Sequence, residues 1–325
     1  MSNLSVNTIT DASGGSTASI NGLTPQASNM QPHNLIINGN MAIWQRGVSQ
    51  TSTGYGCVDR FRNTVSGTVT FAQETTGLPS GFAYALKWTT GAGTSYGQVR
   101  QFIETENVKS LRSKTLTASA YVKVSSNYSG VISWEIGYST GGDGSGASYT
   151  VLAKTNAITA SSSDASADYK RISCNVTIPA DAVGLYIGIV PSVVQATGVY
   201  CSITGVQLEA GPTASPFAHE FVGDTLRKCQ RYYEIIGRDS GSNGYANIFS
   251  TPLDTFANFW TRVSYLVEKR SSPALGFYSG VSWNSTVPTA NLAGVNAVLF
   301  NATSWFFLEG GSGGNAPMAY VDAEL

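Results

Sequence analysis

Apolar residues recur at every second position through residues 34–217, and this period restricts the fold more than any other feature of the sequence. In the run Ile132–Tyr138, for example, Ile, Trp, Ile and Tyr alternate with Ser, Glu and Gly. Successive side chains of a strand point to opposite faces, so such runs are typical of half-buried antiparallel strands. Gly-rich segments such as TTGAGTSYG and STGGDGSGAS separate the runs. Many short strands without a helical period predict a mainly β protein, with a jelly-roll-like β-sandwich over 34–217.

The segment 218–236 breaks this alternation and follows helical spacing instead. Its apolar stripe, at successive steps of 4, 3, 4 and 3 residues, is formed by Val222, Leu226, Cys229, Tyr233 and Ile236. Helices with this heptad spacing pack against copies of themselves. A helix this short is marginal alone in water, because stable helices need about 12–15 residues. We therefore predict a coiled-coil-type helical neck with these five residues at an oligomer interface. The alternative is a single helix packed on a β domain.

Alternation returns in residues 237–325, which predict a small C-terminal β domain. The segment is short and rich in apolar residues, so contacts between subunits would stabilise it more easily than its own core. Tyr245, Tyr278 and Trp283 lie among Gly, Ser and Asn, where a role in the core is harder to assign. Aromatic faces pack on the C–H surfaces of sugars. We predict these three residues as receptor contacts, with Trp283 in a loop; the alternative for Tyr278 is the end of a strand.

Six segments together resemble a known family. They are NLIINGNMAIWQRG (Asn34–Gly47), VDRF (Val58–Phe61), GVQLEAGPTASPF (Gly205–Phe217), CQRYYE (Cys229–Glu234), VEKRSSPAL (Val267–Leu275) and AYVDAEL (Ala319–Leu325). In this order and spacing they are similar to segments of the tail-fibre and receptor-binding proteins of tailed bacteriophages. The resemblance implies a structural virion component, usually a homotrimer, that attaches the particle to a receptor on the host surface.

The segment 1–33 is polar, and it buries too little apolar surface to fold alone. One interpretation is a disordered leader. The other is an anchor that orders against a phage tail or adaptor protein, since the resembling fibres are attached to the virion by their N-terminal end. The chain shows no signal-peptide pattern, and no apolar run approaches the ~18 residues of a membrane helix. A virion protein made in the host cytoplasm, as the resemblance implies, fits these features without membrane insertion, and so does an ordinary cytosolic protein.

The charge and cysteine patterns argue against several classes of function. The formal net charge is −1 and no basic stripe is present, so nucleic acid is not an expected partner. The four cysteines lie far apart without a CxxC pair, and both histidines, His33 and His219, fall in predicted connectors. Neither a metal site nor a Ser-His-Asp triad follows from these positions. We predict no cofactor, no metal and no catalytic residue.

Two other classes of function are alternatives. A fibre-borne glycan hydrolase would need two carboxylates about 5–9.5 Å apart across a glycosidic bond. Its candidate residues are Asp59, Glu104, Glu106 and Glu135, each of which is more simply an exposed strand or loop residue. A purely structural spacer or decoration protein of the particle is the other alternative. The function that the sequence favours is attachment of the virion to a host glycan, without catalysis.

Overall fold

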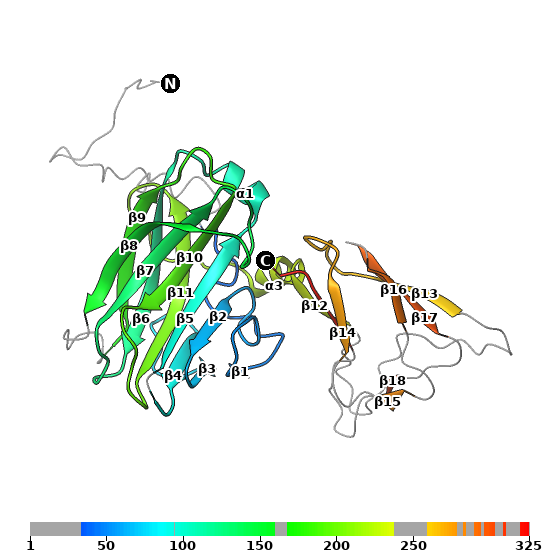
Figure 1. Cartoon of the computed structure of the whole chain (residues 1–325), viewed down its shortest axis with the longest axis horizontal. Coiled ribbons are helices and arrows are strands. Elements are labelled where there is room, and N and C mark those ends of the chain that lie inside the picture. The colour runs from blue at the N-terminus through cyan, green and yellow to red at the C-terminus, as the bar shows by residue number, and fades with distance from the viewer. Residues whose placement is uncertain are drawn as a thin grey trace, which may run out of the picture.

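The structure is a computed structural model that describes residues 34–93, 95–159, 168–236, 259–277, 282–283, 289–293, 296–302, 308–309 and 319–324. Its largest part is a pair of antiparallel sheets (Figure 1). One sheet has the spatial order β1 (Ser49–Gln50), β3 (Val69–Glu74), β4 (Ala85–Thr90), β11 (Tyr200–Ala210), β6 (Thr115–Val124) and β9 (Lys170–Thr177). The other has the order β2 (Arg62–Ser66), β5 (Tyr96–Ile103), β10 (Gly184–Pro191), β7 (Val131–Ser139) and β8 (Thr150–Thr159). The predicted β-sandwich is therefore confirmed.

The strand order is that of a jelly roll. Between β4 and β11 each strand lies in the opposite sheet to the one before it, except that β8 stays in the sheet of β7. As a result, β4, β6, β9 and β11 share one sheet and β5, β7, β8 and β10 share the other. The late strands return to the middle: β11 pairs with β4 and β6, and β10 pairs with β5 and β7. This double Greek-key order brings the apolar faces of both sheets together.

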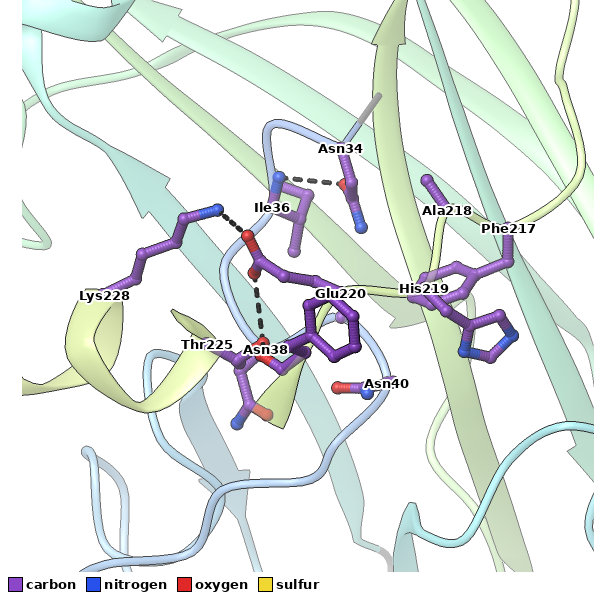
Figure 2. Close-up of a pocket in the computed structure, with 12 residues that line it drawn as sticks. Asn34, Ile36, Asn38, Asn40, Phe217, Ala218, His219, Glu220, Thr225 and Lys228 are labelled. Carbon is purple, nitrogen blue, oxygen red and sulfur yellow. Dashed lines mark hydrogen bonds and ion pairs between the residues drawn. The ribbon is translucent and has the colours of Figure 1, made fainter. Parts of the chain in front are cut away.

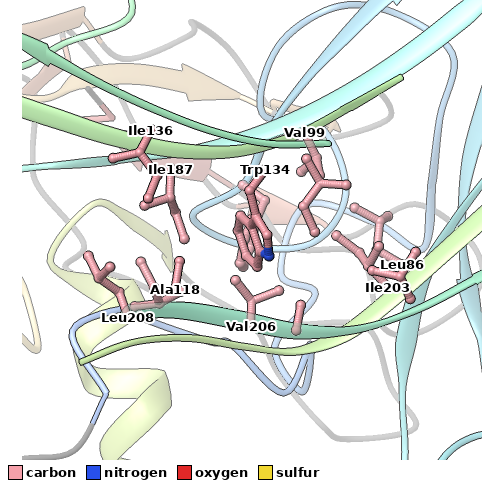
Figure 3. Packing of buried hydrophobic residues seen from close by; sticks show 14 of the residues in the cluster. Leu86, Val99, Ala118, Trp134, Ile136, Ile187, Ile203, Val206 and Leu208 are labelled. Carbon is pink, nitrogen blue, oxygen red and sulfur yellow. The ribbon is translucent and has the colours of Figure 1, made fainter. Parts of the chain in front are cut away.

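The core between the sheets contains Trp134, whose side chain is fully buried. Figure 3 shows its indole reaching from the five-stranded sheet toward Val206 of the other sheet, with Val99 and Ile187 beside it. Small residues such as Ala118 on β6 belong to the same buried cluster and leave room for the large ring. The alternation in the sequence thus produces one continuous core, in which large and small side chains interdigitate.

The outer face of the five-stranded sheet is also covered in part, which the alternation did not predict. Glu135 is buried there, and its carboxylate accepts a hydrogen bond of 2.8 Å from the Tyr186 hydroxyl. The Tyr186 ring covers Gly137, where a Cβ atom would come within 2.3 Å of it. Phe102 and Tyr232 pack with Tyr186 in a small aromatic cluster. Because Tyr232 follows the sandwich in sequence, this cluster marks the place where the C-terminal part of the chain joins it.

Helix α3 (Val222–Gln230) follows the connector after β11, as the sequence predicted, but it is shorter than expected. The chain leaves the helix at the C-cap residue Arg231, and Tyr233–Ile236 form strand β12. The Tyr232 carbonyl accepts a 2.7 Å hydrogen bond from the Ala323 amide, and β12 pairs with β19 (Ala319–Asp322). The continuous heptad seam is therefore a wrong prediction, because Tyr233 and Ile236 belong to a strand.

The five residues of the expected seam have different environments. Cys229, Tyr233 and Ile236 are buried within the chain itself, and Leu226 is half-buried. Val222 is 58 % exposed at the start of the helix. Because three of the five residues point into their own chain, the stripe as a whole does not form a common face for a second helix. The trimer and the interface role of these residues stay predictions.

The C-terminal part of the chain forms further small sheets. Their strands are β12, β19 and β14 (Ala274–Phe277) in one sheet, β13 (Phe259–Ser264), β17 (Ala297–Ala302) and β16 (Thr289–Ala293) in a second, and β15 (Ser282–Trp283) with β18 (Leu308–Glu309) in a third. Figure 1 shows β12 and β14 beside α3, on one side of the sandwich. Of the helices that the described ranges contain, α1 (Thr105–Lys109) and α3, neither is long and apolar enough to cross a membrane.

Candidate functional site

Two polar side chains of β11 hold the connector that leads to α3. Gln207 accepts a 2.8 Å hydrogen bond from the Ala218 amide through its side-chain oxygen. Glu209 accepts hydrogen bonds from both the amide (2.9 Å) and the hydroxyl (2.6 Å) of Ser215. All three of Gln207, Glu209 and Ser215 are buried. In the segment from Gly205 to Phe217, side chains of strand β11 therefore hydrogen-bond to the connector that follows the strand.

Glu209→Ala should lower the free energy of unfolding by about 1–3 kcal/mol, because it leaves two buried donors of Ser215 without an acceptor. Urea denaturation followed by circular dichroism measures this change. Glu106→Ala is the matched control: Glu106 is exposed and pairs only with the exposed Lys109, so it should change stability by less than about 0.5 kcal/mol. Equal denaturation midpoints for the two variants would contradict the anchoring role of Glu209.

The loop from Asn34 to Met41 packs against the same strand. The Asn34 amide donates to the Val206 carbonyl at 2.9 Å, and its oxygen accepts from the Leu208 amide at 3.1 Å. A Cβ atom on Gly39 would lie 2.0 Å from the Val206 carbonyl oxygen, so only glycine fits. Asn38 has a φ of 61°, a left-handed conformation that asparagine tolerates better than most residues. This local geometry accounts for the Asn- and Gly-rich segment at the start of the sandwich.

The loop, the connector and the first turns of α3 enclose a pocket of about 390 Å³ (Figure 2). Glu220 accepts a 3.0 Å hydrogen bond from the Thr225 hydroxyl and pairs with Lys228. These two side chains are the carboxylate and the ammonium group that line the pocket, and their charges neutralise each other. The Asn40 side-chain amide lies among the lining residues in Figure 2 and makes no hydrogen bond to any described residue. It is therefore free to bind a ligand.

Aromatic side chains form one wall and the rim of this pocket. The rings of Phe217 and His219 are 4.9 Å apart, and both pack on Phe82, with centroid distances of 5.1 Å. Gly205, at a φ of 60°, lets Phe82 approach, since a Cβ atom there would lie 2.7 Å from that ring. Phe221 also lines the pocket, and its side chain is 85 % exposed. The site thus combines an exposed aromatic surface, a free amide and no net charge from acidic and basic groups.

The four carboxylates considered for glycan hydrolysis do not line this pocket. Asp59 is buried beside Gln45, and Glu106 pairs with Lys109 at the surface. Glu135 pairs with Arg100 on the outer face of the five-stranded sheet. Glu104 makes two 3.0 Å contacts with the Arg231 guanidinium; although burial opposes it, this hydrogen bonding lowers the pKa of Glu104. Three of these carboxylates are therefore buried or partly buried partners in the fold, rather than exposed residues.

The predicted receptor residues fall in the C-terminal part. Tyr245 and Tyr278 lie outside the described residues. Trp283 lies in strand β15 and pairs with Leu308 of β18, so its predicted loop position is wrong. This strand is only two residues long and lies among turn-forming residues, so the sequence pattern did not indicate it. The receptor role of these three residues stays a prediction.

The pocket residues were not predicted as receptor contacts, although the sequence carries a signal for them. Phe217, His219 and Phe221 occur at alternate positions in the connector PFAHEF. In an extended segment, alternate residues lie on one side. His219 does lie in a connector, as expected. Phe82, which packs on His219, and Asn40, which also lines the pocket, come from distant parts of the chain, so only the fold reveals the site.

No family model matches the sequence, and no curated protein matches it either. Among solved structures, the enzymatically active domain of the bacteriophage CBA120 tailspike protein 4 is similar, with 12 % identity, a TM-score of 0.35 and coverage of 55 % of this chain. The match covers 21 % of the tailspike structure, so this chain corresponds to about a fifth of it. The C-terminal family 22 carbohydrate-binding module of Clostridium thermocellum Xyn10B has 14 % identity and a TM-score of 0.33, and the match covers 53 % of this chain and 98 % of the module. The xylan-binding domain of Paenibacillus barcinonensis Xyn10C has 12 % identity and a TM-score of 0.32, with coverage of 53 % and 100 %.

Proposed function

We propose that this chain is a glycan-binding attachment protein of a bacteriophage virion, a tail-fibre component that holds a host surface sugar without cleaving it. The observation that carries the proposal is the pocket beside α3, which is lined by both the exposed Phe221 ring and the free amide of Asn40. Sugar rings have an apolar C–H face and a rim of hydroxyl groups, and this pair of residues offers a partner for each.

The charge of the pocket supports a neutral sugar as the ligand. Glu220 and Lys228 pair with each other, so neither presents an unpaired charge to a bound molecule. An acidic glycan would have to compete with Glu220 for the Lys228 ammonium. A neutral hexose or N-acetylhexosamine needs only hydrogen-bonding groups and an aromatic face. We therefore propose that the ligand is a neutral surface polysaccharide.

The remaining parts of the proposal come from the resemblance to phage fibres. The segment 1–33 would attach the protein to a phage tail or adaptor protein in the virion. A homotrimer would present three copies of the pocket, and simultaneous binding converts weak single-site affinity into strong avidity. Tyr245, Tyr278 and Trp283 would provide a second receptor contact in the C-terminal part.

Phe221→Ala should weaken binding of a neutral oligosaccharide by about 10- to 100-fold, because burial of a Phe side chain is worth about 1.5–3 kcal/mol. The oligosaccharide is first selected from an array of neutral and acidic bacterial surface glycans, and its dissociation constant is then measured by calorimetry. Val222→Ala is the matched control, since Val222 is exposed beside Phe221 but does not line the pocket.

Equal affinities of wild type and Phe221→Ala would contradict the proposed site. Exclusive binding of acidic glycans on the array would contradict the proposal that the ligand is a neutral polysaccharide. Release of reducing sugar from the bound polysaccharide would favour the hydrolase alternative. Normal adsorption of phage in the presence of excess protein would favour the structural spacer.

A further inference from the structure

The sheet β12–β19–β14 is fastened to the sandwich by charged residues, most of them buried and one of them, Asp322, partly exposed. The cluster consists of Arg46, which precedes β1, of Asp59 and Arg60 from the segment between β1 and β2, and of Asp322 and Glu324 from the C-terminal end; we call it the junction cluster. The Arg46 guanidinium lies 3.1 Å from both the Asp322 and the Glu324 carboxylates. Arg60 pairs with the same Glu324 carboxylate and donates a 3.0 Å hydrogen bond to the Phe102 carbonyl. Segments more than 250 positions apart in the sequence therefore share one ionic network.

Both guanidinium groups are also covered by aromatic rings. Arg46 lies 3.8 Å from the centre of the Tyr233 ring, and Arg60 lies 3.3 Å from the centre of the Tyr232 ring. Arg60 and Asp59 are each 1 % exposed. Water therefore does not screen the charges at the centre of the cluster, and their balance is decided by the groups within it.

Asp59 has no cationic partner of its own. Its carboxylate accepts hydrogen bonds from the backbone amide of Gln45, at 3.0 Å, and from the Gln45 side-chain amide. No Arg or Lys among the described residues forms a salt bridge with it, because Arg46 and Arg60 are engaged by Asp322 and Glu324. The junction cluster thus holds three carboxylates and two guanidinium groups. One negative charge is in excess in a buried environment, where an unpaired charge is costly.

Other titratable groups also lie in or beside the junction cluster. They are Tyr55 and Cys57 from the same loop, Cys229 from α3, and Tyr232 and Tyr233 at the start of the C-terminal sheet. Burial raises the pKa of Cys57 to about 11 and raises the pKa values of Tyr55, Cys229 and Tyr232 above their usual range. None of these four groups adds or removes charge in the cluster between pH 5 and 8. A carboxylate is the group that can restore the balance by taking up a proton.

We propose that Asp59 is a proton-binding site, and that protonation of Asp59 on mild acidification holds the C-terminal sheet more tightly on the sandwich. A neutral Asp59 leaves two carboxylates for two guanidinium groups, so the cluster becomes balanced. The side-chain amide of Gln45 links the site to the sheet, because it also donates a 3.0 Å hydrogen bond to the Tyr233 carbonyl.

The direction of the pH effect follows from linkage. Burial raises the pKa of Asp59 to about 6, against the effect of Arg46, which lowers it. An acid with a higher pKa in the folded chain binds more protons when the chain is folded, so the folded state gains stability as the pH falls through that pKa. The gain in stability of the folded state begins near pH 7 and increases toward pH 5. A buried carboxylate with a well-paired cation would show the opposite direction.

Hydrogen exchange of the full-length chain, read by mass spectrometry at pH 8 and pH 5, tests the proposal. After correction for the intrinsic pH dependence of exchange, protection of β12 and β19 in the wild type should increase by about 10-fold at pH 5. Asp59→Asn should show at pH 8 the protection that the wild type has at pH 5, and should lose the dependence on pH. Asp168→Asn, which removes an exposed carboxylate outside the cluster, should behave as the wild type.

Two results would overturn the proposal. One is equal protection of β12 and β19 in the wild type at both pH values, which needs no variant. The other is an Asp59→Asn protein that folds, as judged by protection of the sandwich strand β6, but keeps the pH dependence of the wild type.

Discussion

Replacing Arg60 with Met is expected to lower the free energy of unfolding by about 3–5 kcal/mol. Arg60 is 1 % exposed, and its guanidinium supplies one of two positive charges that face three carboxylates. Met fills a similar volume, and both residues carry a Cβ atom, so the left-handed φ of 74° at this position is common to both. The loss therefore comes from the charge and its hydrogen bonds. Urea denaturation at pH 7.5 measures it, and the loss should be smaller at pH 5, where proton uptake offsets the excess negative charge.

Arg62→Met is the matched control, because Arg62 lies two residues away and, within the described ranges, donates a hydrogen bond to Thr64 and forms no salt bridge. We expect it to change stability by less than about 0.5 kcal/mol. Adding Glu324→Gln to Arg60→Met should recover part of the loss, since it removes the carboxylate that Arg60 neutralises. A loss of the same size for Arg60→Met and Arg62→Met would show that the junction cluster does not stabilise the fold.

Trp134→Ala is expected to cost about 3–5 kcal/mol, because it removes a large, fully buried side chain and leaves a cavity between two packed sheets. The sheets are held apart by their other core residues, so the cavity cannot collapse completely. Thermal unfolding followed by far-ultraviolet circular dichroism measures the effect. Phe221→Ala provides an aromatic control at an exposed position, where a change below about 0.5 kcal/mol is expected. Similar melting of the two variants would mean that Trp134 does not organise the core.

The sandwich could be predicted because its signal is local. In β7, Ile132, Trp134 and Ile136 alternate with polar or small residues, and the structure places these three residues in the core. A two-residue period can be recognised from neighbouring positions alone, because successive side chains of a strand point to opposite faces and one face is buried. The covered outer face could not be predicted in the same way. Glu135 is buried there because Tyr186, from another strand, lies above it.

The prediction of a continuous helical seam failed because one segment fits both a heptad spacing and a pattern with strand propensity. Tyr233 and Ile236 continue the heptad spacing of Val222, Leu226 and Cys229, but they also belong to YYEII, a run of aromatic and β-branched residues with strand propensity. The backbone of β12 finds its hydrogen-bond partners in β19, which lies more than 80 residues further along the chain. Local spacing contains no information about that partner.

The candidate site lay beyond sequence reasoning for a related reason. Phe217 and Phe221 are close in sequence, but Asn40 reaches the pocket from the first loop of the sandwich. The contacts between the segments that resemble phage fibres also become visible only in the folded structure. Arg46, Arg60 and Glu324 belong to three of these segments, and the fold brings them into one network.

The attachment of both chain segments to β11 has a mechanical consequence. On one side, the Asn34 amide and the Leu35 amide bond to the Val206 and Leu208 carbonyls. On the other side, the connector is held by the side chains of Gln207 and Glu209. A pull between the N-terminal and C-terminal parts of the protein therefore enters and leaves the sandwich within four consecutive residues of one central strand. Along this path the force bypasses the remaining strands, so the jelly roll can stay folded under a load applied to its two ends.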